Sequence, residues 1–320
     1  MGTVGIIANP AAGKDIRRLV SAASPTSDMA KIGIVRRALV GAIEGGADRI
    51  LIADDHKSLG HQAIGGLDQS FDVPVEVIGE EVLPTSFHSR RMASQLRDLG
   101  VGALVTLGGD GTHRDIAKGW RDAPMVPVST GTNNVFPQMI EATVAGHAAA
   151  VAASSRRPLA DIAHRAKVLD VTGVGIKDDL ALIDIALVDG MFTAARAVWD
   201  VDLLRELLVT TAEPATIGLS SIAARVHPVG RRDPGGVHVK LGDGVAQNVR
   251  APIAPGLYHD VGIDSAVRIA SGDAVTLTGP GVLAFDGERD VVLSPGQEVT
   301  VTLHNDGPWV IDATAALEGL

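Results

Sequence analysis

The sequence predicts an α/β + β protein, in which an N-terminal open α/β domain precedes a C-terminal β-rich, sandwich-like domain. In the first half, short apolar runs alternate with helical patterns, which is typical of a mostly parallel sheet covered by helices on both faces. In the second half, β-type alternation recurs between glycine, aspartate and proline turns. The length of 320 residues fits two domains of ordinary size.

The N-terminal elements follow from the spacing of their apolar residues. Strands are expected where short aliphatic runs lie between turn residues, at 4–8, 49–53, 73–78, 103–107 and 125–128. Helices are expected where apolar residues recur every three or four positions, at 34–43, 86–99 and 138–153. The segment Arg156-Arg157-Pro158 ends the last helix. We therefore expect domains at 1–158 and 159–320, and the last segment of the second is a candidate for returning to the first.

The C-terminal domain is expected to consist mainly of strands. Alternating apolar residues between turns predict strands at 167–171, 180–188, 237–241, 261–269, 275–277 and 299–303. One interruption, Met191 to Val209, has helical spacing and is expected to pack on the sheet as a helix.

Charge and composition exclude several classes of function. The chain has 28 Lys and Arg against 38 Asp and Glu, a formal net charge of -10, so nucleic acid is not an expected partner. It has no cysteine, which excludes disulfides, a thiolate nucleophile and Cys-ligated metal sites. Because neither a signal peptide nor a run long enough to span a membrane is found, we expect a cytoplasmic protein without a membrane partner.

The strongest local signal is a glycine-rich turn, Gly108-Gly109-Asp110-Gly111-Thr112, which follows an apolar strand. Glycines let the backbone turn tightly and bring N–H groups toward an anion. The helix that follows adds about half a positive charge at its N-terminus, so phosphate is the ligand that suits this turn best. The alternative is an ordinary strand-to-helix turn with Asp110 as a solvated cap.

Two further loops follow neighbouring strands of the predicted sheet. One is Gly131-Thr132-Asn133-Asn134, whose hydroxyl and amide groups could bind a nucleotide or simply form an Asn-rich turn. The other is Asn9-Pro10-Ala11-Ala12-Gly13-Lys14, in which Lys14 could contact a phosphate or lie in solvent. In open α/β sheets ligands bind at the carboxyl ends of the strands, where these loops are expected to meet.

Together these loops resemble the superfamily of NAD kinases, diacylglycerol kinases and sphingosine kinases. The segments from Asn9 to Arg18 and from Gly131 to Pro137 are most similar to the ATP-NAD kinase branch named after the acetoin-catabolism protein X. The resemblance covers the first 160 residues or so well, and it implies an NAD kinase-like fold for the N-terminal domain. It also implies transfer of the γ-phosphoryl group of ATP to a hydroxyl, with Mg²⁺ as cofactor.

The resemblance assigns roles to individual residues. The nucleotide-binding residues would be Asn9, Gly108, Gly109, Gly111, Thr112, Gly131, Thr132, Asn133 and Asn134. Asp110 would orient or deprotonate the acceptor hydroxyl, or lie next to magnesium. His113, directly after the motif, could reach a phosphate or fill the first turn of the helix.

A carboxylate pair in the second half, Asp286-Gly287-Glu288, resembles the Asp-Gly-Glu of the lipid kinases. Glu288 is therefore a second candidate base. Asp286 is a candidate for binding magnesium or for holding the loop. Asp-Gly is also an ordinary hairpin turn. The pair Arg231-Arg232, like two other arginine pairs, is expected on a solvated surface.

The acceptor is predicted from departures from the NAD kinases. Where they carry an Asn-Glu pair this chain has Ile183-Asp184, and its one tyrosine, Tyr258, lies outside any Gly-Ser-Thr-Ala-Tyr segment. We therefore expect a kinase acting on a small-molecule substrate, a compact and polar metabolite, and a homo-oligomer by analogy. The alternatives are an NAD(H) kinase with an altered pocket and a non-catalytic nucleotide-binding regulatory protein.

Overall fold

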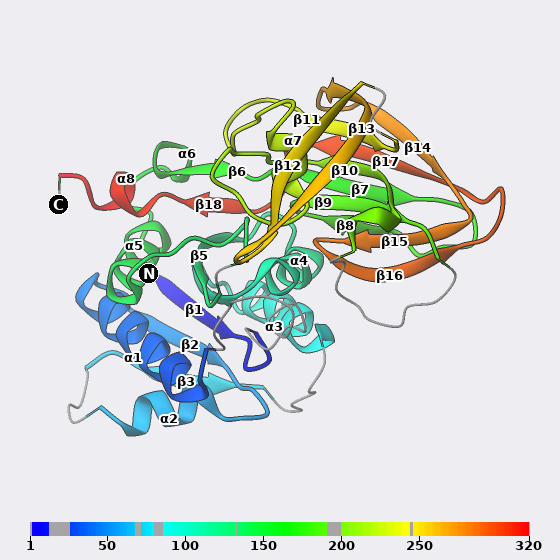
Figure 1. Ribbon diagram of the computed structural model, residues 1–320. Coiled ribbons are helices and arrows are strands. Elements are labelled where there is room, and N and C mark those ends of the chain that lie inside the picture. Colours follow the sequence, from blue (N-terminus) through cyan, green and yellow to red (C-terminus); the bar gives the residue numbers. More distant parts are fainter. Residues whose placement is uncertain are drawn as a thin grey trace.

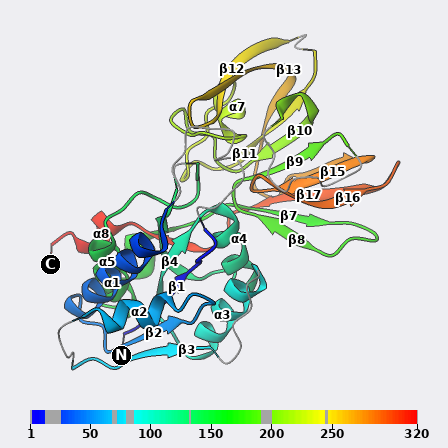
Figure 2. The ribbon, with the colours of Figure 1, turned by 60° about the horizontal axis from the view of Figure 1, so that its bottom comes forward.

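Two regions of different architecture meet in the computed structural model, a helix-covered sheet at the N-terminal end and a stack of β-sheets after it (Figure 1). The structure describes residues 2–12, 26–67, 72–79, 86–131, 133–190, 200–243 and 246–319. The two regions are easily distinguished in the second view, in which the strands of the C-terminal region lie on one side and the helices α1 to α3 on the other (Figure 2).

The first region is built on a seven-stranded sheet with the order β3-β2-β1-β4-β5-β18-β6. The pairs from β3 to β5 and the pair of β5 with β18 are parallel, and only β6 runs antiparallel to its neighbour. The strands are β1 (Thr3–Ala8), β2 (Arg49–Ala53), β3 (Val75–Ile78), β4 (Ala103–Gly108), β5 (Pro124–Ser129), β6 (Ala163–Arg165) and β18 (Trp309–Ile311). The carboxyl ends of β1, β4 and β5 therefore lie side by side.

Helices cover both faces of this sheet because successive side chains of each strand point to opposite sides. In β1, Val4 and Ile6 pack under one set of helices and Ile7 under the other. The first set is α1 (Asp28–Glu44), α2 (Leu59–Gly65), α5 (Ala142–Ala153), α6 (Leu159–Ile162) and α8 (Ala313–Leu317). The second set is α3 (Ser86–Asp98) and α4 (Asp110–Gly119). This places α4 on the face that is turned toward the C-terminal region (Figure 1).

The second region stacks a seven-stranded sheet, with the order β12-β13-β11-β10-β9-β15-β16, against a four-stranded sheet, with the order β14-β17-β7-β8. Aliphatic residues from both sheets, such as Leu187 and Val301, form the core between them. The larger sheet is covered on its other face by α7 (Ser220–Ala224). The strands are β7 (Val168–Thr172), β8 (Asp179–Ala181), β9 (Asp184–Val188), β10 (Leu204–Val209), β11 (Gly236–Leu241), β12 (Gln247–Ala254), β13 (Leu257–Ile269), β14 (Ala274–Thr278), β15 (Gly281–Phe285), β16 (Glu288–Leu293) and β17 (Glu298–His304).

The fold class predicted from the sequence is confirmed, an open α/β region followed by a β-rich sandwich. Both β6, at 163–165, and β18, at 309–311, lie in the first sheet, although they follow residue 158 in the chain. The division into domains at 158 and 159 stays a prediction.

The helix predicted at 191–209 is wrong for its second part. Residues 204–209 form β10, which pairs with β9 on one side and β11 on the other, and residues 201–203 form a short 3-10 helix. The register shifts between Leu204 and Glu206, as in a β-bulge, so the apolar positions 204, 207 and 208 no longer alternate and imitate helical spacing. Residues 191–199 lie outside the described part of the chain.

The single strand predicted at 180–188 is also divided, into β8 and β9. At the break, the backbone amides of Leu182 and Ile183 turn to the carboxylate of Asp286 instead of a neighbouring strand, at 3.1 and 2.7 Å. A buried carboxylate that accepts several amide hydrogens replaces the missing partners of the strand.

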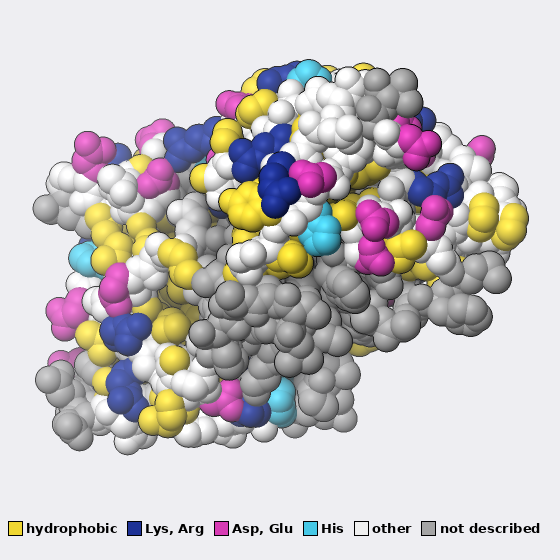
Figure 3. Space-filling model, in the orientation of Figure 1, with side chains coloured by type: hydrophobic (Ala, Val, Ile, Leu, Met, Phe, Trp, Pro, Cys, Tyr) yellow, Lys and Arg dark blue, Asp and Glu magenta, His cyan; other side chains and the backbone are white. Residues whose placement is uncertain are grey.

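No helix in the described part combines the length and apolar character needed to cross a membrane. On the described part of the face in Figure 3, acidic and basic side chains are interspersed with small groups of hydrophobic ones. The expected absence of nucleic-acid and membrane partners stays a prediction.

Helices α1 and α5 approach each other so closely that the contact requires glycine. A Cβ atom on Gly41 would lie 1.9 Å from the backbone oxygen of Thr143, and one on Gly146 would lie 2.0 Å from that of Ala38. We predict that Gly41→Ala lowers the free energy of unfolding by about 2 kcal/mol or more, because backbone atoms must move to admit the methyl group. Urea denaturation measures this.

The matched control lies in the same helix. A Cβ on Gly33 would meet only the end of the Arg37 side chain, at 3.5 Å. Gly33→Ala should therefore raise the free energy of unfolding by up to about 1 kcal/mol, the usual gain from glycine to alanine inside a helix. Equal effects of the two substitutions would contradict the close helix packing.

Candidate functional site

The three loops singled out in the sequence meet at the carboxyl ends of β1, β4 and β5. The side-chain amide of Asn9 donates to Thr112 Oγ1 at 2.9 Å, which joins the first loop to the glycine-rich turn. The amide of Thr130 donates to the carbonyl of Gly108 at 3.4 Å, which joins that turn to the loop after β5. The predicted convergence of these loops is therefore present in the structure.

Two glycines of the turn are needed for this packing. A Cβ on Gly108 would lie 2.4 Å from Cβ of Thr112, and a Cβ on Gly109 would lie 2.9 Å from Oδ1 of Asn134. Both distances are shorter than Cβ contacts in proteins, so a larger residue at position 108 would displace Thr112, and one at position 109 would displace the side chain of Asn134. Their predicted role in binding nucleotide phosphates stays a prediction.

Asp110 is the first residue of α4, and its carboxylate is held by the loop after β5. Oδ1 accepts hydrogen bonds from the backbone amides of Val135, at 3.0 Å, and Phe136, at 2.8 Å. The alternative of a solvated cap does not describe these contacts, because the carboxylate is partly buried and joins two loops. A carboxylate at this position also interacts favourably with the positive end of the helix dipole.

Glu288, from the C-terminal region, reaches the same helix end. Asp286 and Gly287 form the turn of the β15–β16 hairpin with φ values of 49° and 78°, the left-handed conformation that Asp-Gly turns adopt. The turn directs Glu288 at α4, and a Cβ on Gly111 would lie 3.5 Å from Glu288 Oε1. Hence the two candidate bases, Asp110 and Glu288, lie at the beginning of one helix.

Asp286 is buried and its carboxylate is occupied by backbone amides. Oδ1 accepts from Ile183 at 2.7 Å, from Leu182 at 3.1 Å and from Asp184 at 3.2 Å. Burial raises the pKa of Asp286 to about 7, while the guanidinium of Arg114 and these amides act in the opposite direction. These contacts fit the loop-holding interpretation of Asp286. Its assignment to magnesium stays a prediction, and no cluster of three metal-binding side chains occurs among the described residues.

Arg114 connects α4 to the C-terminal region. Its Nε donates to the carbonyl of Leu180 at 2.7 Å, and Nη2 forms ion pairs with Asp179 at 2.8 Å and Asp290 at 3.3 Å. The guanidinium also lies 4.4 Å from the ring centroid of Phe285. Because Phe285 and Asp290 belong to the β15–β16 hairpin, Arg114 fixes that hairpin, and so Glu288, against the helix.

Asp115 was not singled out in the sequence. It lies half-buried on α4, and burial raises its pKa to about 7; Arg114 and Lys118 oppose this, and the charges of Glu288 and Asp179 add to it. The cation of Lys118 pairs with Asp179 at 2.8 Å. A lone carboxylate in a helix carries no signal of such surroundings, since the neighbours that raise its pKa come from β8 and β16.

His113 fills the first turn of α4, the second of the two interpretations left open by the sequence. Its Nδ1 lies 2.8 Å from the carbonyl of Gly109 and its Nε2 lies 2.9 Å from Thr106 Oγ1. Since a carbonyl only accepts, the proton is on Nδ1, and Nε2 accepts from the hydroxyl. Burial lowers the pKa of His113 to about 4, so the ring is neutral at pH 7.

Asn133 carries an amide group that the described part of the protein leaves unsatisfied. Its Nδ2 and Oδ1 are both buried without a hydrogen-bond partner, and so is the hydroxyl of Thr130. A Cβ on Gly218, in the C-terminal region, would lie 3.7 Å from Asn133 Oδ1. Buried polar groups are nearly always paired, so an orphaned amide between two regions is a candidate ligand contact.

The other predicted residues of this loop have different surroundings. Asn134 turns back into the loop, donating to Ser129 Oγ at 2.9 Å, and the carbonyl of Gly131 accepts from the same hydroxyl at 2.8 Å. Thr132 and the segment Gly13-Lys14 lie outside the described residues.

Arg231 was expected from the sequence only as one member of a solvated arginine pair. Its guanidinium donates to the carbonyls of Phe136, at 2.7 Å, and Val135. The amides of the same two residues bind Asp110. The segment is thus held from both sides, by a carboxylate of α4 and by a guanidinium of the C-terminal region. No local pattern could indicate this, because the partners of Arg231 are backbone atoms.

Comparisons with known proteins agree with this architecture. Residues 57–155 match the family model of the ATP-NAD kinase N-terminal domain, and residues 167–306 match that of the acetoin catabolism protein X C-terminal domain. The acetoin catabolism protein X of Cupriavidus necator is 36% identical over 327 residues, an alignment that covers 98% of this chain and 91% of that protein.

Two solved structures are similar in fold at low identity. Yeast NADH kinase complexed with NADH has 14% identity and a TM-score of 0.55, with 98% of this chain and 83% of that chain covered. A putative diacylglycerol kinase from Bacillus anthracis has 12% identity and a TM-score of 0.50, with 97% of each chain covered. At these identities the likeness concerns the fold alone.

The buried neutral ring of His113 gives a pH dependence that can be measured. Since its pKa is lowered below the ordinary value, the unfolded chain binds the proton more readily, and stability is lost as the pH falls from about 6.5 toward 4. Between about pH 7 and about pH 4.5, the wild-type protein should lose about 2 kcal/mol more than His113→Asn. Urea denaturation across this range measures the difference.

The exposed His61, replaced by glutamine, is the control substitution, since its side chain is 59% exposed. Its curve should follow the wild type. If His113→Asn also follows the wild type in slope, the neutral buried ring is not the source of the pH dependence.

Proposed function

The chain belongs to the family of the acetoin catabolism protein X, and from this premise we propose that it is an ATP-dependent kinase that phosphorylates a hydroxyl of a small, polar metabolite. The NAD kinase-like fold and the match of residues 57–155 to the ATP-NAD kinase N-terminal domain support a kinase-type function. That match includes both the glycine-rich turn and the loop after β5.

One observation carries the proposal: carboxylates from distant parts of the chain meet at the beginning of α4. Asp110 is the first residue of the helix, and Glu288 Oε1 lies 3.5 Å from the position that a Cβ on Gly111 would take. The first amides of a helix have no partner within it and attract an anion. Carboxylates beside such an anion-binding position are the arrangement that phosphoryl transfer to a hydroxyl needs.

The chemistry requires mainly positioning. The oxygen of the acceptor hydroxyl forms a bond to the γ-phosphorus, the bond from that phosphorus to the β–γ bridging oxygen breaks, and ADP leaves. The hydroxyl proton passes to a carboxylate. Glu288 is the better base of the two, because the carboxylate of Asp110 already accepts hydrogen bonds from two backbone amides, which fix it in place. Asp110 then orients the hydroxyl.

ATP and Mg²⁺ fit the residues that are present. The orphaned amide of Asn133 offers a donor and an acceptor to the nucleotide. Mg²⁺ in proteins is usually held by one or two carboxylates together with substrate phosphates, and it neutralises charge on the transferring group when bound. Asp110 is the carboxylate placed to stand beside it, since it is the first residue of α4 and is only partly buried, whereas Asp286 is buried under the β8–β9 break.

The position equivalent to the Asn-Glu pair of NAD kinases supports a metabolite acceptor over NAD. Ile183 is only 3% exposed and belongs to the hydrophobic core under α3 and α4. Asp184 Oδ1 accepts from the amide of Gly287 at 3.2 Å, so its carboxylate faces the hairpin turn. Neither side chain is available to hydrogen-bond a ribose or an adenine ring.

A screen of ATP consumption over polyols, hydroxyketones, hydroxy acids and nicotinamide nucleotides tests the activity. With the best acceptor, Asp110→Asn should lower the rate of ADP formation by at least about a hundredfold, and Glu288→Gln nearly as much, which is the scale of a positioned base. Asp98→Asn, at a side chain that is 67% exposed, is the control and should keep the wild-type rate.

Comparable turnover in all of these proteins would overturn the assignment of the two carboxylates. Binding of ATP with no ADP formed from any acceptor would favour the regulatory alternative. Conversion of NAD to NADP as the preferred reaction would favour the NAD kinase alternative.

Asn133 allows a test of the nucleotide site that does not depend on turnover. Asn133→Ala should raise the Kd for ATP about tenfold, since hydrogen bonds of the amide to the ligand are lost. It should leave the free energy of unfolding of the ligand-free protein unchanged or higher, because the amide has no partner among the described residues. Calorimetric titration with ATP and urea denaturation measure the two effects.

The exposed Asn248, replaced by alanine, is the matched control and should change neither quantity. An unchanged Kd for ATP in Asn133→Ala would exclude the amide from the nucleotide site. A loss of stability by several kcal/mol would give Asn133 a structural role instead.

A further inference from the structure

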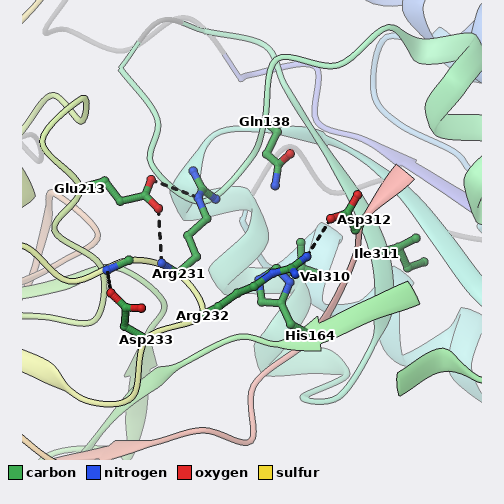
Figure 4. Close-up of a pocket in the computed structure, with 10 residues that line it drawn as sticks. Gln138, His164, Glu213, Arg231, Arg232, Asp233, Val310, Ile311 and Asp312 are labelled. Carbon is green, nitrogen blue, oxygen red and sulfur yellow. Dashed lines mark hydrogen bonds and ion pairs between the residues drawn. The ribbon is translucent and has the colours of Figure 1, made fainter. Parts of the chain in front are cut away.

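A cavity of about 340 Å³ lies beside Gln138, which follows the loop whose amides bind Asp110, and Figure 4 shows the residues that line it. It is formed between β6 and β18 of the first sheet and the segments around Glu213 and Gly230 of the second region. Its volume falls at the lower end of the range typical of small-molecule sites. The residues that line it are Gln138, His164, Glu213, Gly230, Arg231, Arg232, Asp233, Val310, Ile311 and Asp312.

The hydrogen-bond donors of this cavity are only partly used. Within the described part of the chain, Arg231 uses two of its five N–H groups for the carbonyls of Phe136 and Val135, and Arg232 uses one for Asp312. The Nδ1 atom of His164 is buried and has no hydrogen-bond partner among the described residues. Figure 4 shows both arginines and His164 gathered in the cavity, with the amide of Gln138 opposite them.

The acidic groups of the cavity are, in contrast, already paired. Glu213 accepts from the backbone amide of Arg231 at 3.3 Å and faces its guanidinium at 3.6 Å. Asp233 accepts from the amide of Gly230 at 2.7 Å. Asp312 caps α8 through the amide of Thr314 at 3.0 Å and binds Arg232 at 2.7 Å. What the cavity has to offer a ligand is therefore mainly donors.

The electric field at His164 has the matching sign. Burial lowers the pKa of His164, the charges of Arg232, Arg231 and Lys167 lower it further, and the charge of Asp312 raises it. Lys167 Nζ donates to the carbonyls of Gly230 and Gly235, each at 2.9 Å, so its cation lies beside the segment that contains the two arginines. Three cations therefore act on the ring, and their positive charge favours a negatively charged ligand.

We propose that this cavity binds a compact organic oxyanion of metabolite size, a phosphate monoester or a carboxylate, through Arg231, Arg232, Gln138 and His164. The site is separate from the kinase site proposed above and does not depend on it. Because Arg231 also holds the carbonyls of Val135 and Phe136, an anion bound to its remaining N–H groups acts on the segment whose amides hold Asp110. Binding in the cavity is thereby coupled to the position of that carboxylate.

The test uses the full chain and two probes, inorganic phosphate and succinate, at constant ionic strength with chloride as the reference salt. The Cε1–H resonance of His164, identified by its absence in His164→Gln, reports the cavity and not the glycine-rich turn. We expect one or both probes to shift it saturably with Kd in about the millimolar range, and to raise the titration midpoint of the ring because an anion offsets the arginines. The probe that binds more tightly identifies the phosphate or the carboxylate class.

Arg232→Gln should weaken this binding about tenfold, the usual loss of a charged hydrogen bond. Arg232 is 62% exposed, so its substitution is compatible with folding, which circular dichroism checks. Arg250→Gln is the matched control, an arginine that is 65% exposed and paired with Asp260 outside the cavity, and should bind the probes as the wild type does. The proposal is overturned if the His164 resonance moves no more with phosphate or succinate than with chloride, or if Arg232→Gln and Arg250→Gln bind equally well.

Discussion

The hydrogen bonds between the carboxylate of Asp110 and the backbone amides of Val135 and Phe136 are the contact on which the rest of the site depends. They join the glycine-rich turn after β4 to the loop after β5 at 2.8 to 3.0 Å. Arg231 holds the carbonyls of the same segment from the C-terminal region. The loop after β5 is thereby fixed by charged side chains on both sides, so the proposed nucleotide site would lose little conformational entropy on binding.

The second constraint is the helix α4 itself, which serves both regions of the molecule. Asp110 is its first residue, and the neutral ring of His113 packs in its first turn. Arg114 extends from the helix to the strands of the second region. Because Arg114 binds the β15–β16 hairpin, the position of Glu288 depends on the same helix. A displacement of the hairpin would thus separate the two carboxylates that the proposed transfer requires.

The fold and the meeting of the loops were predictable, while the contacts that hold them were not. Periodicity indicates parallel strands, and the carboxyl ends of such strands share an edge, so the loops containing Asp110 and Asn133 had to come together. The position of Glu288 was suggested only by resemblance, since a hairpin turn has no local sign of what it faces. Arg231 was predicted to be solvated because its partners are backbone carbonyls, and β10 was mistaken for a helix because a bulge imitates helical spacing.

A crystal structure of the protein with Mg²⁺ and a non-hydrolysable ATP analogue tests the central claim most directly. The account predicts the triphosphate at the first turn of α4, with the β15–β16 hairpin and Glu288 facing its terminal phosphorus and the amide of Asn133 in contact with the nucleotide. An analogue bound elsewhere, or a first turn of α4 closed to the triphosphate by protein atoms, would contradict it.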